Sequence, residues 1–434
     1  MALPEARQDL TEAVLAAHPL PEAGPWLTHA REAARLRLAA LGMPMGRDEY
    51  WKFTRPDAWT GAKAHDASAE ASRVFDAAAP LTLVFVDGVF DAEASDDAAL
   101  EHVKIERLAD VAHTDLHWAK ALYGALEASA NEAPRVDGAR LFKPVARPLA
   151  ALNTATAEDG LLIHATGAVA RPIRISYRSG GGEAVLHHLV KVDPGASLTL
   201  LEEGQPGGRS NVMLEADIAE TGTFHHLRIQ APEQDRATLT NLFARTGVES
   251  TFKSFGFTAN GAATRNEAVL EILGDNAVAH IAGGCLGDGA RGKFHHDDTV
   301  YITHDAVNCE SRQVFKKVLR NGAVGVFQGK ILVQPHAQKT DGYQISQSLL
   351  LDDDSQFLAK PELEIYADDV ACSHGSTSGA IDEEALFYLR SRGVQRKTAE
   401  NLLTLSFLAE ALDEIEDAEL AEMVLGQIEG WLAD

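Results

Sequence analysis

Hydrophobic and polar positions divide the chain into three zones with different periods. Residues 1–60 are rich in Ala and Leu, and apolar positions recur at helical spacing in 28–42, where Gly42 is a stop signal. From about residue 81 to 375 the chain breaks into short β-rich runs punctuated by Gly, Asp, Asn and Pro. Residues 380–434 return to a helical period. We therefore expect helices on either side of a long β region.

The middle zone shows almost no helical period for more than two hundred residues beyond residue 150. Such a series of short strands without alternating helices indicates a barrel, two β domains or a long stacked structure. A β-solenoid accounts for the length best, because each coil buries its inner face on its neighbours. No fixed repeat length emerges from the sequence, so the residues alone leave these alternatives open.

The predicted regions are an N-terminal helical region, a β-helix core with a helical insertion, and a C-terminal helical region, at 1–80, 81–375 (insertion about 95–150) and 376–434. In the last region Asp382 is a plausible N-cap, acids fill the first turn, and Gly393 is a stop signal. An apolar stripe follows, which we expect to pack on the rest of the chain rather than on a partner. The stripe comprises Leu402, Leu405, Leu408 and Leu412.

Composition narrows the function classes. The 434 residues include 39 Lys+Arg and 64 Asp+Glu, a net charge of −25, which argues against a general nucleic-acid binder. Cys285, Cys309 and Cys372 are far apart and odd in number, which excludes a disulfide framework and fits a reducing compartment. Neither a signal-peptide core at the N-terminus nor an apolar run of membrane-spanning length is present, so we expect a cytoplasmic protein.

Charge is unevenly distributed. Six Lys or Arg residues and no acid lie between Ser311 and Thr340, whereas nine acids lie between Glu410 and Asp434 and no Lys or Arg follows Lys397. The contrast has a plain interpretation, which is solubility. It also fits an acidic helical tail that meets a basic partner, or a basic stretch at a subunit contact.

Two glycine-rich stretches fail as nucleotide-binding motifs. GDGARG (287–292) has dinucleotide-binding spacing, but a strand-like run follows it where the chemistry needs a helix, so we interpret it as a turn. Gly329-Lys330 lacks both the earlier glycine, replaced by Val324, and the following Ser or Thr, replaced by Ile331. The chain is therefore not expected to hydrolyse ATP through a P-loop.

Adjacent histidines occur three times, at 187–188, 225–226 and 295–296. Neighbours in a strand point to opposite faces, so one pair cannot grip one metal. His296 and Asp298 of HHDD (295–298) share a face, but two ligands do not make a site. We interpret that face as a solvated polar one.

Cys372-Ser373-His374-Gly375 is the short stretch whose side chains are best suited to reactivity or metal binding. Cys372 and His374 are two apart, so in an extended chain both leave the same face, and thiolate with imidazole suits iron, zinc or copper. The residues alone favour a structural Cys and a satisfied His. A complete site needs ligands from elsewhere, for example from a second chain.

The strongest resemblance lies in KPELEIYADDVACSHGSTSGAIDEEALFYLRSRG (360–393). This block resembles the C-terminal signature of the SufB/SufD family of iron–sulfur cluster assembly proteins, in its SufD branch, because the SufB branch differs at Cys-Ser-His-Gly. Residues 49–59, 84–90 and 325–344 agree with the same family. The family usually has Ala-Thr-Val-Gly after His-Gly, where this chain has Ser376-Thr377-Ser378-Gly379.

The resemblance implies a right-handed parallel β-helix with N-terminal and C-terminal helical regions. It implies pairing with SufB through the β-helix ends, a homodimer when the chain is alone, and binding of the SufC ATPase by the C-terminal helices. By motif match, Cys372 and His374 face the SufB–SufD interface, and His374 is linked to iron acquisition. We expect a non-enzymatic scaffold with no cofactor on the isolated chain, which holds iron or a nascent iron–sulfur cluster transiently with SufB.

Two other functions compete with this one. The first is a β-helix enzyme such as a polysaccharide lyase or an acyltransferase. A lyase would normally carry a signal peptide and a groove of acids with an Arg base, and the sequence shows neither. The second is a purely structural homodimer without a metal role.

Overall fold

The computed structural model describes residues 3–61, 68–69, 72–97, 99–114, 117–132, 135–136, 139–140, 145–230 and 235–433. One sheet contains β1 (Ser68–Ala69), β2 (Leu81–Val86), β3 (Val89–Asp91), β8 (Ile173–Gly180), β10 (Ser197–Gly204), β12 (Thr223–Gln230), β14 (Thr251–Ala259), β16 (Val278–Asp288), β18 (Glu310–Arg320), β20 (Asp341–Leu350) and β22 (Ala371–Gly379). The other contains β4 (Val103–Arg107), β7 (Leu161–Ala165), β9 (Glu183–Val192), β11 (Arg209–Ile218), β13 (Ala237–Thr246), β15 (Ala263–Ile272), β17 (His295–His304), β19 (Val324–Val333) and β21 (Gln356–Ile365). β5 (Arg135–Val136) pairs with β6 (Ala139–Arg140).

Helices lie before, within and after the strands. The α-helices are α1 (Glu5–Ala17), α2 (Pro25–Leu41), α3 (Asp57–Thr60), α4 (Leu108–Val111), α5 (Ala125–Ala130), α6 (Pro148–Thr156), α7 (Glu383–Ser391), α8 (Arg396–Leu412) and α9 (Ala418–Ala433). Short 3-10 turns are η1 (Glu49–Trp51), η2 (Asp76–Ala78), η3 (Trp118–Ala121) and η4 (Gly289–Arg291). No helix in the described ranges is long and apolar enough to cross a membrane.

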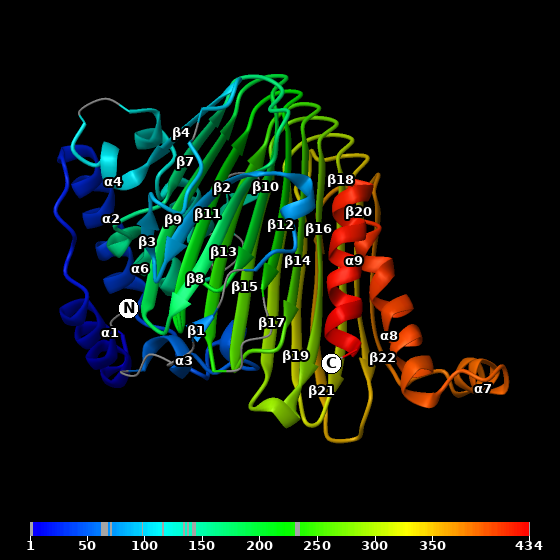
Figure 1. Ribbon diagram of the computed structural model, residues 1–434. Coiled ribbons are helices and arrows are strands. Elements are labelled where there is room, and N and C mark those ends of the chain that lie inside the picture. Colours follow the sequence, from blue (N-terminus) through cyan, green and yellow to red (C-terminus); the bar gives the residue numbers. More distant parts are fainter. Residues whose placement is uncertain are drawn as a thin grey trace.

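Successive strands from β7 to β22 alternate between the two sheets, and every pairing among them within a sheet is parallel. Each coil therefore contributes one strand to each sheet, and the stack forms a parallel β-solenoid of about 7 turns (Figure 1). This confirms the predicted β-helix with helical regions at both ends. At the first coils the two sheets end in β3 and β4, each of which pairs antiparallel with its neighbour.

The coils differ in length, and this explains why the sequence shows no fixed period. Ser197 of β10 pairs with Thr223 of β12, whereas Val278 of β16 pairs with Glu310 of β18, so the later coil takes up a longer stretch of chain. Turns of different length absorb the difference while the strands stay in register. Inner-face residues still recur every second position along each strand.

The inner faces of the two sheets supply the apolar core of the solenoid. Side chains such as Leu200, Phe252, Ala279 and Ile302 are buried there. The N-terminal helices cover the outer face of the sheet that contains β9 and β11, where α6 packs. Asn153 of α6 fixes this layer by donating to the backbone carbonyls of Leu186 (3.0 Å) and Asn211 (2.7 Å).

The C-terminal helices cover the outer face of the other sheet, at the end of the stack where β16, β18 and β20 lie (Figure 1). α7 begins after Asp382, whose Oδ1 accepts from the N–H groups of Glu384 (2.9 Å) and Ala385 (3.1 Å), as the N-cap prediction required. Gly393 adopts φ +88° just after this helix. The division into three domains stays a prediction; strand β22 ends at Gly379 and α7 begins at Glu383.

Candidate functional site

The last coil of the solenoid has one open side. Among the described strands, β22 pairs only with β20, and β21 pairs only with β19, so both are edge strands. Side chains of β22 are mostly exposed because no further coil covers its inner face. This open coil is where the chain places the Cys-Ser-His-Gly stretch.

Cys372 and His374 leave the same face of β22, and that face is the inner one. Cys372 packs against the buried cluster that contains Ile331 and Val333, which are inner residues of β19 in the opposite sheet. On the other side of His374, the Ser376 hydroxyl bonds to that of the buried Ser346 in the preceding coil, at 3.0 Å. His374 lies between these two inward side chains and is exposed.

The two candidates differ in their surroundings. Cys372 is half-buried, and burial raises the pKa of its thiol, so at neutral pH it is protonated and a metal ion must displace that proton to bind. His374 is exposed and open to a ligand from solvent or from a second chain. In the part of the chain that the structure describes, no three His, Cys, Asp or Glu side chains are grouped to hold a metal. Cys372 and His374 are therefore an incomplete ligand set.

The other cysteines lie inside the protein. Cys285 and Cys309 are buried, and burial raises the pKa of Cys285 to about 12. Both thiols are thus protonated and shielded from solvent. Cys372 is the cysteine placed to meet a ligand.

His296 and Asp298 share a face, as their spacing predicted, but the expectation of a solvated face was wrong. They point into the solenoid and are 1% and 5% exposed. Lys317 of the opposite sheet enters the same space and donates to Asp298 Oδ2 at 2.6 Å and to His296 Nδ1 at 2.7 Å. Burial and the Lys317 charge lower the pKa of His296 to about 3, so the ring is a neutral acceptor. The positive charge of Lys317, on β18, thus compensates the buried carboxylate of Asp298, on β17.

A second polar group lies inside the earlier coils. Tyr177 donates to Glu202 Oε2 at 2.6 Å, and the ring of His226 bonds to Glu202 Oε1 at 2.7 Å. Burial acts to raise the pKa of Glu202, but the hydrogen bond from His226 and the charge of Arg228 outweigh it and hold that pKa well below its usual range. His188 also points inward, toward Tyr177 (3.1 Å).

The histidine pairs point to opposite faces, as strand geometry predicted. His188 points into the solenoid, whereas its neighbour His187 points outward, bonds to Glu215 at 2.9 Å and stacks on Tyr123. Glu215 in turn accepts the backbone N–H of Gly124 at 2.6 Å. These contacts attach the α5 region to the sheet, and this histidine pair serves structure rather than metal binding.

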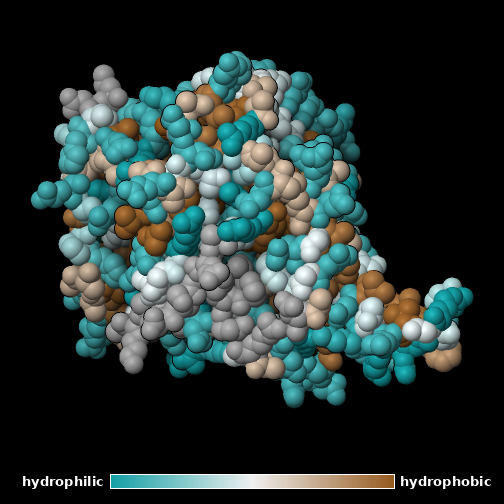
Figure 2. Space-filling model, in the orientation of Figure 1, coloured by the Kyte–Doolittle hydropathy of each residue, from teal (hydrophilic) through white to brown (hydrophobic). Residues whose placement is uncertain are grey.

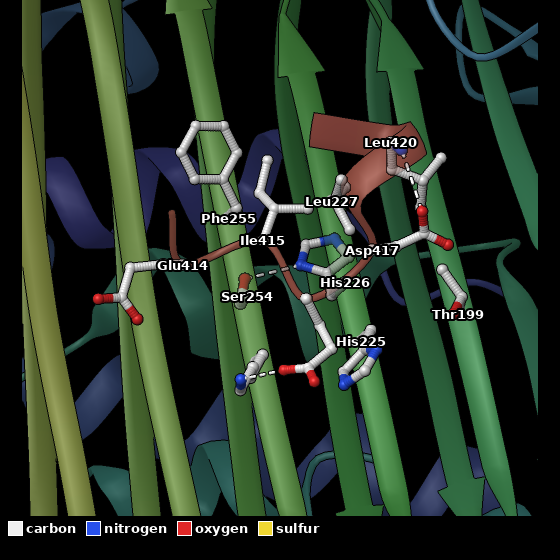
Figure 3. A pocket seen from close by; sticks show the side chains of 12 residues that line it. Thr199, His225, His226, Leu227, Ser254, Phe255, Glu414, Ile415, Asp417 and Leu420 are labelled. Carbon is white, nitrogen blue, oxygen red and sulfur yellow. Dashed lines mark hydrogen bonds and ion pairs between the residues drawn. The ribbon is translucent and has the colours of Figure 1, made fainter. Parts of the chain in front are cut away.

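A small pocket lies beneath the loop that joins α8 to α9, over β12 and β14 (Figure 3). His280 Nδ1 bonds to Glu414 at 2.9 Å, Lys253 bonds to Glu416, and Asp417 Oδ1 accepts from the N–H groups that begin α9. The cavity of about 10 Å³ holds one water molecule at most. This loop is therefore a structural joint that fastens the two helices to the solenoid.

One ion pair joins the basic stretch to the acidic tail within the chain. Lys316 of the basic stretch has a side chain that is 2% exposed and bonds to Glu410 of α8. Its ammonium also lies 4.7 Å from the centre of the Phe407 ring. Glu410 of the acidic tail thus pairs with a cation of the chain's own basic stretch, whereas Lys317 and Lys330 of that stretch pair with Asp298 and Glu364.

The apolar stripe of α8 packs on the sheet, as expected, through Leu408 and Leu412, which join Phe255 and Val318 in one buried cluster. Leu402 differs, since it is 47% exposed.

α7 projects away from the solenoid and carries an exposed apolar surface (Figures 1 and 2). Phe387 and Tyr388 are 73% and 54% exposed. Sequence reasoning did not single out these two residues, although adjacent aromatics on an amphipathic helix were a signal. Exposed aromatics beside polar residues are typical of protein-binding surfaces.

Residues 176–407 match the family model described as "SUF system FeS cluster assembly, SufBD core domain". The match covers the coils from β8 onward, the Cys-Ser-His-Gly stretch and α7. The chain belongs to the SufBD family. As a SufBD family member, it takes part in iron–sulfur cluster assembly by the SUF system.

SufBD relatives resemble the chain over most of its length. It is 28% identical over 410 residues to the iron–sulfur cluster assembly protein SufD of Escherichia coli, which covers 90% of each chain. It is 27% identical over 429 residues to a SufBD family protein of Synechocystis, covering 91% of this chain and 88% of the relative. The similarity to SufD of Bacillus subtilis is 28% over 170 residues, covering 39% of this chain and 38% of that protein.

Proposed function

We propose that the chain is a non-enzymatic scaffold subunit that pairs with a SufB chain through its open last coil and contributes half of the site that receives iron. Iron is the cargo of this site, and the cluster is built there before it is passed on. The arrangement that carries the proposal is the pair Cys372 and His374 on the inner face of a coil with no successor. A soft thiolate and an imidazole are suitable iron ligands, and two of them need completion from another chain.

The edges of the open coil favour a partner strand at the same place. β21 and β22 each present one row of unpaired backbone groups, which template the addition of another strand. A partner that docks there brings its own side chains against His374. Pairing and completion of the metal site are thus one event.

We further propose that the C-terminal helices dock the SufC ATPase, with α7 as the contact element. α8 and α9 are fixed to the sheet by apolar packing and by the Lys316–Glu410 and Lys253–Glu416 pairs. α7 extends from this fixed base with its aromatics exposed. Movement of an ATPase bound there is transmitted to the solenoid, and an ATPase with different affinity for two arrangements of the scaffold shifts the interface between subunits.

The metal-site proposal is tested with His374→Ala in the complex with SufB and SufC, reconstituted anaerobically with iron and sulfide. We expect normal folding and normal SufC binding, with loss of the cluster absorption bands. Ser373→Ala is the matched control, since Ser373 is the exposed neighbour on the opposite face of β22. A normal cluster yield from His374→Ala refutes the proposal. The chain alone, under the same conditions, separates a shared site from a purely structural homodimer.

The docking proposal is tested with Phe387→Ser on α7 rather than by removing helices. Deletion from residue 394 onward would uncover the apolar sheet face beneath α8 and confuse loss of binding with loss of folding. We expect Phe387→Ser to lose co-purification with SufC while its far-ultraviolet circular dichroism stays unchanged. Glu384→Ala, an exposed substitution on the same helix, is expected to bind normally. Retained SufC binding by Phe387→Ser refutes the assignment of α7.

A further inference from the structure

Two buried glutamines form a ladder on the inner face of the last coils and lead to His374. Gln313 of β18 is in register with Gln344 of β20, and Gln344 is in register with His374 of β22. Gln344 Nε2 donates to Gln313 Oε1 at 2.8 Å, and Gln313 Nε2 donates to the backbone carbonyl of Lys330 at 3.4 Å. Both glutamine side chains are fully buried.

Each glutamine of the ladder donates through its amide nitrogen, and the amide oxygen of Gln344 is left without a donor. Both amide nitrogens are engaged, so turning the Gln344 amide around would bring its oxygen against the oxygen of Gln313. Gln344 Oε1 is therefore fixed on the other side, where it is buried and has no hydrogen-bond partner. A buried carbonyl oxygen without a donor has lost its hydrogen bonds to water without replacement, which is a reason to expect a donor at this position.

Gly329 of β19, across the interior, leaves the space that the Gln344 amide occupies. A Cβ atom at this position would collide with Gln344 Nε2 and would lie 2.6 Å from Phe327 Cζ. The amide group therefore occupies space that only a glycine leaves free.

The next donor in the stack is the His374 ring. The Ser346–Ser376 and Ser348–Ser378 hydroxyl pairs, at 3.0 Å and 2.9 Å, show that inner side chains of β20 and β22 meet across the strands. His374 occupies the corresponding place opposite Gln344.

We propose that Gln344 is a positioning residue for His374: its Oε1 accepts one ring N–H, which fixes the tautomer and leaves the other ring nitrogen free to bind iron. The inference rests on the proposed role of His374 and adds the residue that orients it. Histidine ligands of metals commonly donate their second N–H to such an oxygen, and loss of the acceptor costs about 10–100-fold in metal affinity. Gln344 touches neither iron nor the partner chain.

The test observes the imidazole directly, in the full-length chain labelled with ¹⁵N-histidine. Two-bond ¹H–¹⁵N spectra are recorded above the ordinary titration range of histidine, and His374→Ala identifies the His374 signals. We expect a single neutral tautomer in the unsubstituted chain and a mixture in Gln344→Met, which keeps the side-chain length but removes the acceptor. Ser348→Ala, on the same face of β20, is the control and leaves the His374 signals unchanged.

Gln344→Glu guards against a folding failure of the methionine variant. Burial favours the protonated acid, whose O–H replaces the amide N–H as donor to Gln313 Oε1 and whose carbonyl oxygen accepts the ring N–H. We therefore expect the same protonated nitrogen with a shifted ¹⁵N signal, and iron binding in the SufB complex close to that of the unsubstituted chain. Gln344→Met is expected to lower iron affinity of that complex by about 10–100-fold. Unchanged His374 signals in either Gln344 variant overturn the inference. A normal cluster yield from His374→Ala overturns only the proposed function, so the two failures are distinguishable.

Discussion

Replacement of Lys317 by Met tests the buried charge cluster inside the solenoid. The Lys317 side chain is 1% exposed and its ammonium lies 2.6 Å from Asp298 Oδ2. Methionine keeps the length of the side chain and removes the charge. Asp298 is then left buried, with Asn266 still donating to it at 2.9 Å. Breaking a buried ion pair from one side costs about 3–5 kcal/mol, and we expect that loss of unfolding free energy at neutral pH.

The pH dependence of this loss gives the sharper test. Burial acts to raise the pKa of Asp298, but the Lys317 charge outweighs it and holds that pKa below its usual value. The carboxylate therefore stabilises the native chain above its unfolded pKa, and this contribution disappears as pH falls through the folded pKa. In Lys317→Met burial remains without the opposing charge, so the pKa of Asp298 rises above its unfolded value. Protonation then relieves the penalty, and we expect a clearly smaller loss at about pH 5.

Urea unfolding followed by circular dichroism at both pH values measures the effect. The double variant Lys317→Met/Asp298→Asn removes the unpaired charge and is expected to recover most of the stability at neutral pH. Lys104→Met is the control, because the Lys104 side chain is 62% exposed and ion pairs of such exposed side chains contribute about 1 kcal/mol or less. Equal losses at both pH values, with no recovery in the double variant, refute the reasoning.

Three further predictions concern packing and thiol chemistry. Leu408→Ala, at a side chain that is 1% exposed, is expected to cost about 2–5 kcal/mol and to speed proteolytic release of the C-terminal helices, whereas Leu402→Ala is expected to stay within about 0.5 kcal/mol; equal sensitivity would contradict the packing. Gly329→Ala places a methyl group against Gln344 and is expected to cost about 1–3 kcal/mol in chemical unfolding, and an unchanged midpoint would contradict the close contact. Iodoacetamide is expected to alkylate Cys372 first in the native chain. Because the pKa of this thiol is raised, little of it is thiolate at neutral pH, and the rate is expected to rise with pH. Mass spectrometry reports the site, and a pH-independent rate would contradict the assignment.

The solenoid was predictable because its signal is local and repeated. Runs such as 197–204 and 223–230 alternate apolar and polar residues along strands, and no helices separate them. The length of each coil was not predictable. Turns of different length change the step between paired strands from coil to coil, and no short-range signal fixes a turn's length.

The polar interior was also not predictable, because it depends on pairs that are distant in sequence. HHDD (295–298) alone looks like a solvated face, and only Lys317, on the opposite sheet, supplies the charge that lets Asp298 be buried. The acidic tail is a similar case. Its partner on the sheet, Lys316, was visible as part of a basic stretch, but strand pairing decides which cation faces which acid.

The candidate site was half predictable. Cys372 and His374 share a face because a strand has a period of two, and the motif alone shows that spacing. Gln344 lies one full coil earlier in the chain, in a stretch of ordinary composition. Its relation to His374 follows from strand register, which a sequence with variable coils does not reveal.

The open last coil also sets how many chains can associate. An edge that meets a different surface of the next copy leaves another edge free, and the assembly grows into a fibre. If two chains meet open coil to open coil, each covers the edges of the other and no template is left. At the first coils the sheets end in the shorter strands β3 and β4, of 3 and 5 residues, against 10 in β21 and 9 in β22. Very short edge strands are poorer templates for a further strand. The longer edges lie at the coil that exposes His374, so a meeting of two open coils would cover the stronger template and the candidate site together.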